Sequence, residues 1–428
     1  MHPNITLILS FFGAYFFLYQ YFRSACYRDP TSRFFQPERA SAPTYSTHRI
    51  RQSIEYADSA GLDLAEAQAK PKVDGTNPPD LCIGIPSVHR EGMGYLKPTL
   101  GSLQQGLSPQ ERSRLHFVVF LAHVDQKQHE DYNQPWLLSM ADTLPTYPNP
   151  DVAELMVNQN HGTKSKFDYS LVMDECERTG APYIMMLEDD VVFVEGWWSR
   201  VSKALETATS KTWSAGYKDF LYLRLFYYEG LQGWDSVYWR TYVAWSTFVT
   251  IAVASLSLYA RRRVPASRRY LTYSGLFLVV AVFTPLSIAL YFVAGRNCVA
   301  PRPAGVNLMP DHACCGQGFV FPRDKVTSEL LPSFRRHRWS TIPTDSFIER
   351  HADNTKALRW ALTPVVMQHI GGWSSHNVNR GGGVTPARLW NFGFEQFDAS
   401  RLAREHRLVA RDNSTLWSRE LADDIWIP

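Results

Sequence analysis

Three acidic residues in a row, Glu188, Asp189 and Asp190, follow the apolar run Tyr183–Leu187, and apolar residues resume at Val191. A short apolar run between turn-forming residues is typical of a buried strand. Carboxylates at the end of such a strand are costly unless a cation neutralises them. Mg²⁺ and Mn²⁺ prefer carboxylate oxygens and keep positions open for substrate phosphates. The triplet therefore predicts a metal–diphosphate site for a nucleotide-linked donor, with an acidic turn after a core strand as the alternative.

A second set of polar residues lies in the last third of the chain. Thr344 or Asp345 can be the N-cap of a helix that includes Glu349. The run 365–372 is apolar up to His369 and then turns at two glycines, which predicts a last strand. His369 is either a metal ligand or a hydrogen-bonded histidine of the core.

Glycines precede another apolar run. Gly316, Gln317 and Gly318 stand directly before Phe319–Phe321. Glycines at the start of a strand allow a ligand to approach the backbone closely, so we place these three residues on the acceptor side of the site. The segment is no phosphate-binding P-loop, because the GK[ST] signature is missing. A plain turn is the alternative.

The elements that must position these residues are alternating strands and helices. Strands are predicted at 81–86, 116–122, 183–187, 218–225 and 319–321, and helices at 50–69, 95–105 and 166–178. Alternation of this kind predicts a parallel α/β sheet. In such a sheet, a ligand site lies at the carboxyl ends of the strands, where the acidic triplet stands.

Three apolar segments are long enough to cross a bilayer: 5–22, 242–260 and 271–294. The first is interpreted as an uncleaved anchor; a cleaved signal peptide is the alternative, but no small-residue cleavage site follows it. The other two form a hairpin, because only the arginine-rich stretch 261–269 separates them. A pair of buried core helices is the alternative for the hairpin.

Arginines in a short loop favour the cytosolic side, which places both outer ends of the hairpin and the rest of the chain after the anchor in a lumen. Arg23, Arg28 and Arg33 conflict with this orientation, and the tighter arginine cluster of the hairpin decides it. Strands fall on both sides of the hairpin, so one luminal domain interrupted by it is predicted. The expected parts are an anchor (1–22), a stem or packing segment (23–78), a first domain part (79–241), the hairpin (242–294) and a second domain part with a tail (295–428).

Composition excludes one class of partner. The net charge of +3 at pH 7 gives no sign of nucleic-acid binding. None of the six cysteines shows zinc-finger spacing. In an oxidising compartment we expect Cys298 to pair with Cys314 or Cys315 across a proline-containing loop. The sequon at Asn413 would then be available for N-glycosylation.

Three segments together resemble a known family. Leu81–Glu91 (LCIGIPSVHRE), Lys166–Tyr169 (KFDY) and Leu187–Asp190 (LEDD) are similar to the N-acetylglucosaminyltransferase-IV-type glycosyltransferases, which have the GT-A, Rossmann-like fold. The anchor and the interrupted domain are similar to the post-GPI-attachment GalNAc transferases of the Golgi. The resemblance covers residues 81 to 375. It implies an α/β GT-A domain, a UDP-sugar donor, Mn²⁺ or another divalent cation, inversion, and a GPI-anchored protein or GPI glycolipid as acceptor.

The resemblance also implies roles for single residues. Asp190 would be the direct metal ligand, with His369 approaching the metal, and Asp345 would be the base, with Glu349 as the fallback one helical turn later. Glu188 departs from the usual Asp of the motif, so its role is less defined. Residues implied in nucleotide or donor binding are Pro86, Val88, Arg90, Glu91, Val124, Asp125, Lys164, Lys166, Asp168, Tyr169, Glu188 and Asp189.

Two rival functions stay open. The same fold could transfer GlcNAc or galactose to an N-glycan or another glycolipid, because the donor pocket cannot be read from the sequence. The chain could also be a membrane-anchored glycan-binding protein on a disabled fold. The intact acidic triplet and the late acid Asp345 favour an enzyme. The oligomeric state is not predicted.

Overall fold

The computed structural model describes residues 3–62, 78–92, 94–157, 159–309, 315–371 and 389–411. Cys314 and the sequon at Asn413 lie outside these ranges. The chain divides into two compact units, each built from two separate stretches of sequence. Residues 43–228 and 303–428 form the sheet unit, and residues 1–42 and 229–302 form the helical unit.

The sheet unit is built on a seven-stranded sheet of order β2-β1-β3-β7-β5-β8-β6. Its strands are β1 (Leu81–Ser87), β2 (Leu115–Leu121), β3 (Tyr183–Leu187), β5 (Tyr222–Arg224), β6 (Gly305–Leu308), β7 (Gly318–Pro322) and β8 (Arg359–Thr363). Strands from before and after the helical stretch 229–302 lie next to one another, since β7 pairs with both β3 and β5. One sheet therefore uses both halves of the chain.

The prediction of a parallel sheet is correct only in part. β2, β1 and β3 are parallel, and so are β5 and β8, whereas β7 and β6 run antiparallel to their neighbours. A parallel pair needs a crossover, and α5 and α9 supply the crossovers for the first three strands. β6 and then β7 follow the point where the chain comes back from the helical unit, and among the described residues no crossover helix links β7 to β3 or β5.

A second, two-stranded sheet stands beside the acidic triplet. β4 (Val191–Phe193) pairs antiparallel with β9 (Met367–His369), and Val191 lies opposite His369. The chain thus passes from β3 through the triplet directly into β4. The antiparallel register brings His369, which is far away in sequence, next to Asp190.

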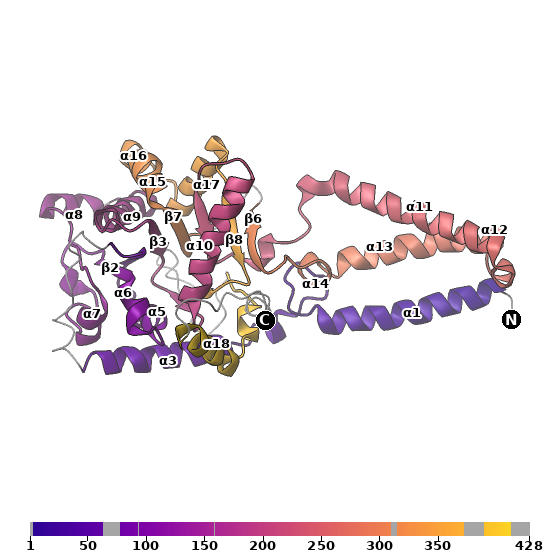
Figure 1. The fold of residues 1–428 in the computed structure, drawn as a ribbon, viewed down its shortest axis with the longest axis horizontal. Helices are drawn as coiled ribbons and strands as arrows, with labels where there is room; N and C mark the ends of the chain where they lie inside the picture. The colour runs from indigo at the N-terminus through magenta and orange to yellow at the C-terminus, as the bar shows by residue number, and fades with distance from the viewer. Residues whose placement is uncertain are drawn as a thin grey trace. The chain divides into compact units, whose positions relative to one another are not determined.

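Helices cover the large sheet (Figure 1). α9 (His161–Arg178) packs on β1, β2 and β3, and its N-cap Asn160 accepts a hydrogen bond from the Thr163 amide. The other helices of this unit are α3 (Tyr45–Ala60), α5 (Leu96–Gln104), α6 (Pro109–Ser113), α7 (Pro135–Met140), α8 (Pro150–Val157), α10 (Trp197–Ser214), α15 (Arg323–Lys325), α16 (Leu331–Arg336), α17 (Thr344–Thr355) and α18 (Ala399–Arg411).

The segment 23–78 contains a packing helix. α3 packs on α5 through the buried Arg49, whose Nε donates to the Phe193 carbonyl at 2.7 Å and whose Nη2 donates to the Ser102 carbonyl at 2.8 Å. Arg49 is fully buried, so these bonds replace the water that the guanidinium loses. Of the two interpretations of this segment, the packing helix applies to residues 45–60.

The helical unit contains three helices long and apolar enough to cross a membrane: Pro3–Ala25, Glu229–Arg263 and Tyr273–Val293. The first is α1 (Pro3–Ala25), the second contains α11 (Trp239–Arg263), and the third joins α12 (Tyr273–Phe277), a π-helical turn (Leu278–Phe283) and α13 (Thr284–Val293). The apolar windows of the first two are 0% buried within the chain. Helices this apolar and this exposed are explained by a lipid environment and not by a soluble core. Two short helices, α2 (Pro37–Ala40) and α14 (Arg296–Val299), complete the unit.

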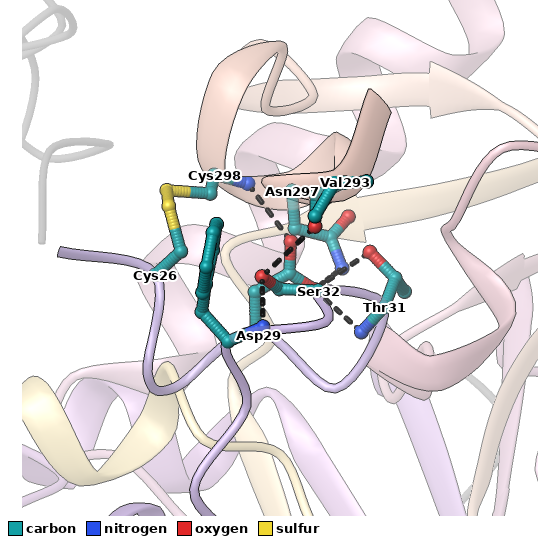
Figure 2. The surroundings of a disulfide bond; sticks show 8 residues. Cys26, Asp29, Thr31, Ser32, Val293, Asn297 and Cys298 are labelled. Atoms are coloured by element: carbon teal, nitrogen blue, oxygen red, sulfur yellow. Dashed lines mark hydrogen bonds between the residues drawn. A yellow bond between two sulfur atoms is a disulfide. The ribbon is translucent and has the colours of Figure 1, made fainter. Parts of the chain in front are cut away.

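A disulfide joins the ends of two of these helices (Figure 2). Cys26, just after α1, is bonded to Cys298 in α14, which follows α13. The prediction that Cys298 pairs with Cys314 or Cys315 is therefore wrong. The pairing was read from neighbours in sequence, whereas the fold brings Cys26 and Cys298 together across 272 positions. Cys315 is also disulfide-bonded.

Hydrogen bonds fix the same joint. Asp29 accepts from the Thr31 amide at 2.8 Å, the Cys298 amide at 3.0 Å and the Asn297 side chain at 3.2 Å (Figure 2). Gly295 has φ +90°, and a Cβ there would stand 2.4 Å from the Asp29 carboxylate. The disulfide thus holds the carboxyl ends of α1 and α13 on the same side of any bilayer that the helices cross. The arginine-rich turn 261–269 follows the carboxyl end of α11, between α11 and α12.

Candidate functional site: an acidic cluster at the end of the central strands

The acidic triplet occupies the turn between β3 and β4. Side-chain atoms of Glu188, Asp190 and His369 lie within 4.8 Å of one another, close enough to bind one metal ion together. His369 Nε2 is 3.3 Å from Asp190 Oδ2. The Ile370 amide donates to the Asp190 carbonyl at 2.8 Å, which fixes the turn against the end of β9.

Two observations show that this cluster fits a metal ion. Within the described residues, Asp190 Oδ1 and His369 Nδ1 are buried without a hydrogen-bond partner. A Cβ at Gly371 would stand 2.1 Å from Asp190 Oδ2 and 3.1 Å from His369 Nε2, so the space beside both side chains depends on this glycine. Two carboxylates and an imidazole form a suitable ligand set for Mn²⁺ or another divalent transition metal.

The charges of the site are strongly coupled. Burial, together with the neighbouring Asp190 carboxylate, raises the pKa of Glu188 to about 8. Burial alone would raise the pKa of Asp190, but His369 and Arg90 hold it below its usual value. Burial would lower the pKa of His369, but the Asp190 and Glu188 carboxylates raise it. Without a metal ion the cluster retains protons, which is the behaviour expected of a cation site with excess negative charge.

Asp189 faces away from this cluster toward the loop after β1. Its Oδ1 accepts from Arg90 Nη1 at 2.7 Å, and its Oδ2 accepts from Ser87 Oγ at 2.5 Å. The hydroxyl of Thr99 on α5 donates to the carbonyls of Asp189 and Val191, each at 2.7 Å. The middle acid and the backbone around it are therefore held in one orientation by β1 and α5.

The predicted base lies opposite Glu188. A Cβ at Gly316 would be 2.9 Å from Glu188 Oε1 and 3.6 Å from Asp345 Cβ, so only the width of a glycine separates the two acids. Asp345 Oδ2 accepts from the Cys315 amide at 3.2 Å. Gln317 Nε2 donates to Glu188 Oε2 at 3.2 Å, and Gly318 pairs with Leu187. The glycine segment thus lines the site on the side of β7.

Asp345 is not the N-cap of its helix. α17 begins at Thr344 with Pro343 as N-cap, and no cap side chain bonds to the helix. The prediction of Thr344 or Asp345 as N-cap is therefore wrong. Asp345 stands in the first turn and is half-buried, and its Oδ1 accepts from the adjacent Ser346 amide. Its Oδ2 accepts from the Cys315 amide, which orients the carboxylate toward the glycine segment.

Glu349 lies on another face of α17. It is buried, and its Oε1 accepts from Tyr222 at 2.6 Å and from Arg224 Nη2 at 2.5 Å. Its Oε2 accepts from Arg359 Nη1 at 3.0 Å. Both oxygens therefore serve an ion-pair network that joins α17 to β5 and β8.

Side chains of α9 that resemble nucleotide-binding residues are mostly engaged within the protein. Lys166 Nζ donates to the carbonyls of Ser340 and Ile342, and so ties α9 to the segment before α17. Lys164 Nζ binds Asp168 Oδ2 and the Ala122 carbonyl, and Tyr147 donates to Asp168 at 2.7 Å. Burial raises the pKa of Asp168 against the opposing effect of Lys164.

Tyr169 differs from its neighbours on α9. Its hydroxyl is buried and has no hydrogen-bond partner among the described residues. Burial and then the Glu188 charge raise the pKa of this phenol, and Asp345 adds to this, whereas Arg224 opposes it. Tyr169 is therefore an α9 residue that is within electrostatic reach of Glu188 and Asp345.

The remaining predicted donor residues lie after β1 and β2. Pro86 is in β1, and Val88 packs partly buried against the core, whereas Glu91, Val124 and Asp125 are exposed. Asp125 caps a short 3₁₀ turn by accepting from the Lys127 amide at 3.1 Å. Sequence reasoning did not find Ser87, Thr99 or His129, which act through contacts between distant segments.

Comparison with known proteins identifies the chain. A family model described as GPI-N-acetylgalactosamine transferase PGAP4 matches residues 81–368, more than half of the chain, and spans the helical interruption. The chain belongs to this family. The match covers the acidic triplet and Asp345, and ends one residue before His369.

Curated relatives are similar over a shorter region. The chain is 30% identical over 149 residues to alpha-1,3-mannosyl-glycoprotein 4-beta-N-acetylglucosaminyltransferase A of Xenopus tropicalis, covering 31% of this chain and 27% of the relative. It is 27% identical over 154 residues to the Gallus gallus protein of the same name, covering 31% of this chain and 28% of the relative. Against the B form of Danio rerio it is 28% identical over 160 residues, covering 31% of this chain and 27% of the relative. The alignments thus cover less than a third of the relatives' length, and family and relatives alike are named as glycosyltransferases.

Proposed function

We propose that the chain transfers GalNAc from UDP-GalNAc to the mannose core of GPI anchors, with inversion, on a GT-A domain. The observation that carries this proposal is the Glu188–Asp190–His369 cluster facing Asp345, in a member of the GPI-N-acetylgalactosamine transferase family. A metal-binding set beside a free carboxylate is what a metal-dependent transfer between a nucleotide sugar and a hydroxyl requires.

In the proposed reaction, Asp190, His369 and Glu188 hold a divalent cation such as Mn²⁺. A cation held there would supply positive charge for the leaving diphosphate. Asp189, fixed by Arg90 and Ser87, contacts the ribose or a bound water. Arg90 adds a positive charge on the same side, since its Nη2 is 3.9 Å from Asp190 Oδ2.

Asp345 accepts the proton of the attacking acceptor hydroxyl. Its carboxylate is oriented by the Cys315 amide and is free of ion pairs among the described residues. Glu349 is unsuitable for this step, because its two oxygens already bind Arg224 and Arg359. The glycine segment Gly316–Gly318 leaves room for the acceptor between Asp345 and the donor.

The proposed location is the Golgi membrane, with the sheet unit in the lumen. Two disulfides, Cys26–Cys298 and Cys82–Cys176, support an oxidising compartment. Five arginines in the turn 261–269 support a cytosolic hairpin tip. The Cys26–Cys298 bond requires α1 and α13 to end on the same side, which agrees with luminal ends despite Arg23, Arg28 and Arg33.

The interruption itself supports a membrane-held acceptor. A soluble acceptor requires only one anchor, whereas this chain leaves and re-enters its sheet unit through two further apolar helices. We propose that the hairpin keeps the transferase domain at the bilayer, where a GPI glycolipid or a GPI-anchored protein would be met. Transfer of GlcNAc or galactose by the same site is the second candidate, since the relatives are named as N-acetylglucosaminyltransferases.

A donor panel tests the proposal. Purified full-length protein in detergent is given UDP-GalNAc, UDP-GlcNAc or UDP-galactose with a GPI-anchored acceptor, and the glycan product is analysed by mass spectrometry. We expect an added N-acetylhexosamine with UDP-GalNAc alone. Transfer from UDP-GlcNAc or UDP-galactose alone would keep the reaction class and replace the donor, and binding of UDP without transfer from any donor would favour a glycan-binding protein.

A further inference from the structure

A second group of metal-ligating side chains lies in the loop after β2. His129, Glu130 and Asp131 bring one side-chain atom each within 4.8 Å of the other two. His129 Nδ1 is 3.8 Å from Glu130 Oε2 and 3.8 Å from Asp131 Oδ2. None of these three residues belongs to the Glu188–Asp190–His369 cluster.

The hydrogen bonds of His129 determine which of its two ring nitrogens carries the lone pair that a metal ion could bind. Ser87 Oγ donates its proton to Asp189 Oδ2 at 2.5 Å, so it must accept from His129 Nε2–H at 3.0 Å. Nδ1 then carries a lone pair, which accepts weakly from the Asp131 amide at 3.2 Å. The lone pair of the neutral imidazole thus lies at Nδ1, 3.8 Å from each carboxylate, and a metal ion there would replace the hydrogen bond from the Asp131 amide.

Groups that carry or can take a positive charge lie near this arrangement, with His89 in contact with Glu130 and the charge of Lys97 acting on Asp131, but neither binds Asp131 Oδ2. His129 is 3% exposed and Asp131 is 7% exposed, so both are largely withdrawn from water. Asp131 Oδ2 is buried and has no hydrogen-bond partner in the described parts of the chain. A nitrogen lone pair and two carboxylate oxygens that face one another repel unless a cation or a proton lies between them, and burial together with Glu130 raises the pKa of Asp131 to about 7.

We infer that His129, Glu130 and Asp131 form a second divalent-metal site, of the kind that takes Zn²⁺. Metal–ligand bonds of about 2.1 Å in tetrahedral geometry separate the ligand atoms by about 3.4 Å. The two distances from His129 Nδ1 are 3.8 Å and all three atoms lie within 4.8 Å of one another, so the side chains would have to draw closer around the ion. One imidazole nitrogen and two carboxylate oxygens suit Zn²⁺, and a fourth position stays open for water or for His89, which contacts Glu130.

Such a site would act on the donor side of the first cluster through a defined connection. The second nitrogen of a metal-ligating histidine usually donates to a group that fixes the ring. Here His129 Nε2 donates to Ser87, and Ser87 donates to Asp189. His129 is therefore a positioning residue: a metal bound at Nδ1 would fix the ring, and with it the hydroxyl that orients Asp189.

Zinc binding to full-length protein in detergent tests this inference. Asp190→Asn serves as the background, which weakens the first cluster, and bound Zn²⁺ is measured by equilibrium dialysis with elemental analysis. We expect one Zn²⁺ per chain in this background. Adding Asp131→Asn, which keeps the size of the side chain, should weaken zinc binding at least about 100-fold, and Glu130→Gln should weaken it about 10-fold or more.

Glu55→Gln is the matched control, because Glu55 is an exposed acid on α3 that pairs only weakly with Arg51 at 4.0 Å. It should leave zinc binding unchanged. Zinc affinity that is the same in Asp131→Asn as in the background, or no bound Zn²⁺ in the background, would overturn the inference. Weakened UDP binding by Asp131→Asn without any zinc binding would assign the cluster to the nucleotide pocket instead. The donor panel on wild-type protein tests the proposed function separately, because it does not depend on zinc binding.

Discussion

At the residue scale, Asp345 and Glu349 lie one helical turn apart on α17 and have different surroundings. Asp345 is half-buried, with backbone amides as its hydrogen-bond donors, whereas Glu349 is buried between two arginines. A group that must accept a proton from a substrate needs a free oxygen, and a group that neutralises two buried guanidinium groups does not have one. The two acids should therefore respond differently to neutralisation.

We predict that Asp345→Asn lowers the transfer rate by about 10²–10⁴-fold with little change in thermal stability, because it removes a general base. Glu349→Gln should instead lower the free energy of unfolding by about 3–5 kcal/mol, because it leaves Arg224 and Arg359 without their carboxylate. Transfer kinetics and thermal unfolding of both variants check this. Full activity of Asp345→Asn would exclude it as the base.

A single methyl group tests the space beside the metal ligands. Gly371→Ala places a Cβ 2.1 Å from Asp190 Oδ2 unless the backbone moves. We predict that it raises the Mn²⁺ concentration needed for half-maximal activity by about 10–100-fold, as changes beside metal ligands do. Gly92→Ala is the control: Gly92 also lies in a loop of the sheet unit, and its Cβ would meet nothing within 4 Å, though its φ of +73° carries some strain. An equal metal requirement in both variants would contradict this account of Gly371.

At the element scale, the position of α9 on the sheet depends on a disulfide. Cys82 in β1 and Cys176 in α9 are bonded and fully buried. Replacing both by alanine removes a crosslink across 94 positions and should lower the free energy of unfolding by about 2–4 kcal/mol. Thermal unfolding with and without reductant measures this. Reductant should lower the unfolding temperature of the wild type. The shift should be smaller in the double variant, which no longer has the Cys82–Cys176 bond.

Strands within clear apolar runs were predictable, and two strands without such a run were not. β1, β2 and β3 are mostly apolar, and the predicted runs 218–225 and 365–372 contain the short strands β5 and β9. β6 is four residues long, and β8 begins with Arg359, so neither has a clear pattern. The antiparallel direction of β7 and the register of β4 with β9 depend on pairing between distant segments, which residue spacing does not encode.

Contacts between distant segments also limited what could be predicted of the site. The acidic triplet, Asp345 and His369 were selected by residue type and by family resemblance, and the structure brings them to one place. Ser87, Thr99 and His129 were missed, because each acts through a side-chain contact to a segment 42 to 102 positions away. Lys166 carries the right charge for a diphosphate, but its bonds to two carbonyls depend on how α9 packs.

At the scale of the whole molecule, the chain passes between the two units three times, first from Ala42 to Pro43. The chain leaves the sheet unit after Tyr228 and re-enters it at Pro303. These three connections would restrain the sheet unit relative to a bilayer more than a single anchor does, since both ends of the interruption are fixed as well as the segment after α1. For the proposed reaction, this restraint would concern the membrane-held acceptor and not the donor, because UDP-sugars are soluble.

We predict that replacing residues 239–293 by a short flexible linker, with α1 kept as anchor, lowers transfer to a membrane-held GPI acceptor at least about 10-fold. Hydrolysis of the UDP-sugar and transfer to a detergent-solubilised glycan should fall much less. The three rates are measured in proteoliposomes with equal amounts of folded protein. Equal losses in all three would show that the hairpin serves folding and not acceptor delivery.

In the proposed function, Glu188, Asp190 and His369 hold a metal ion that the transfer requires. The most direct measurement is UDP release from UDP-GalNAc by full-length protein with a GPI-anchored acceptor, with and without Mn²⁺, beside Asp190→Asn. We predict release that depends on Mn²⁺ in the wild type and is lost in Asp190→Asn, while the variant remains folded. Release that persists after complete metal removal, or that is unchanged in Asp190→Asn, would contradict the claim.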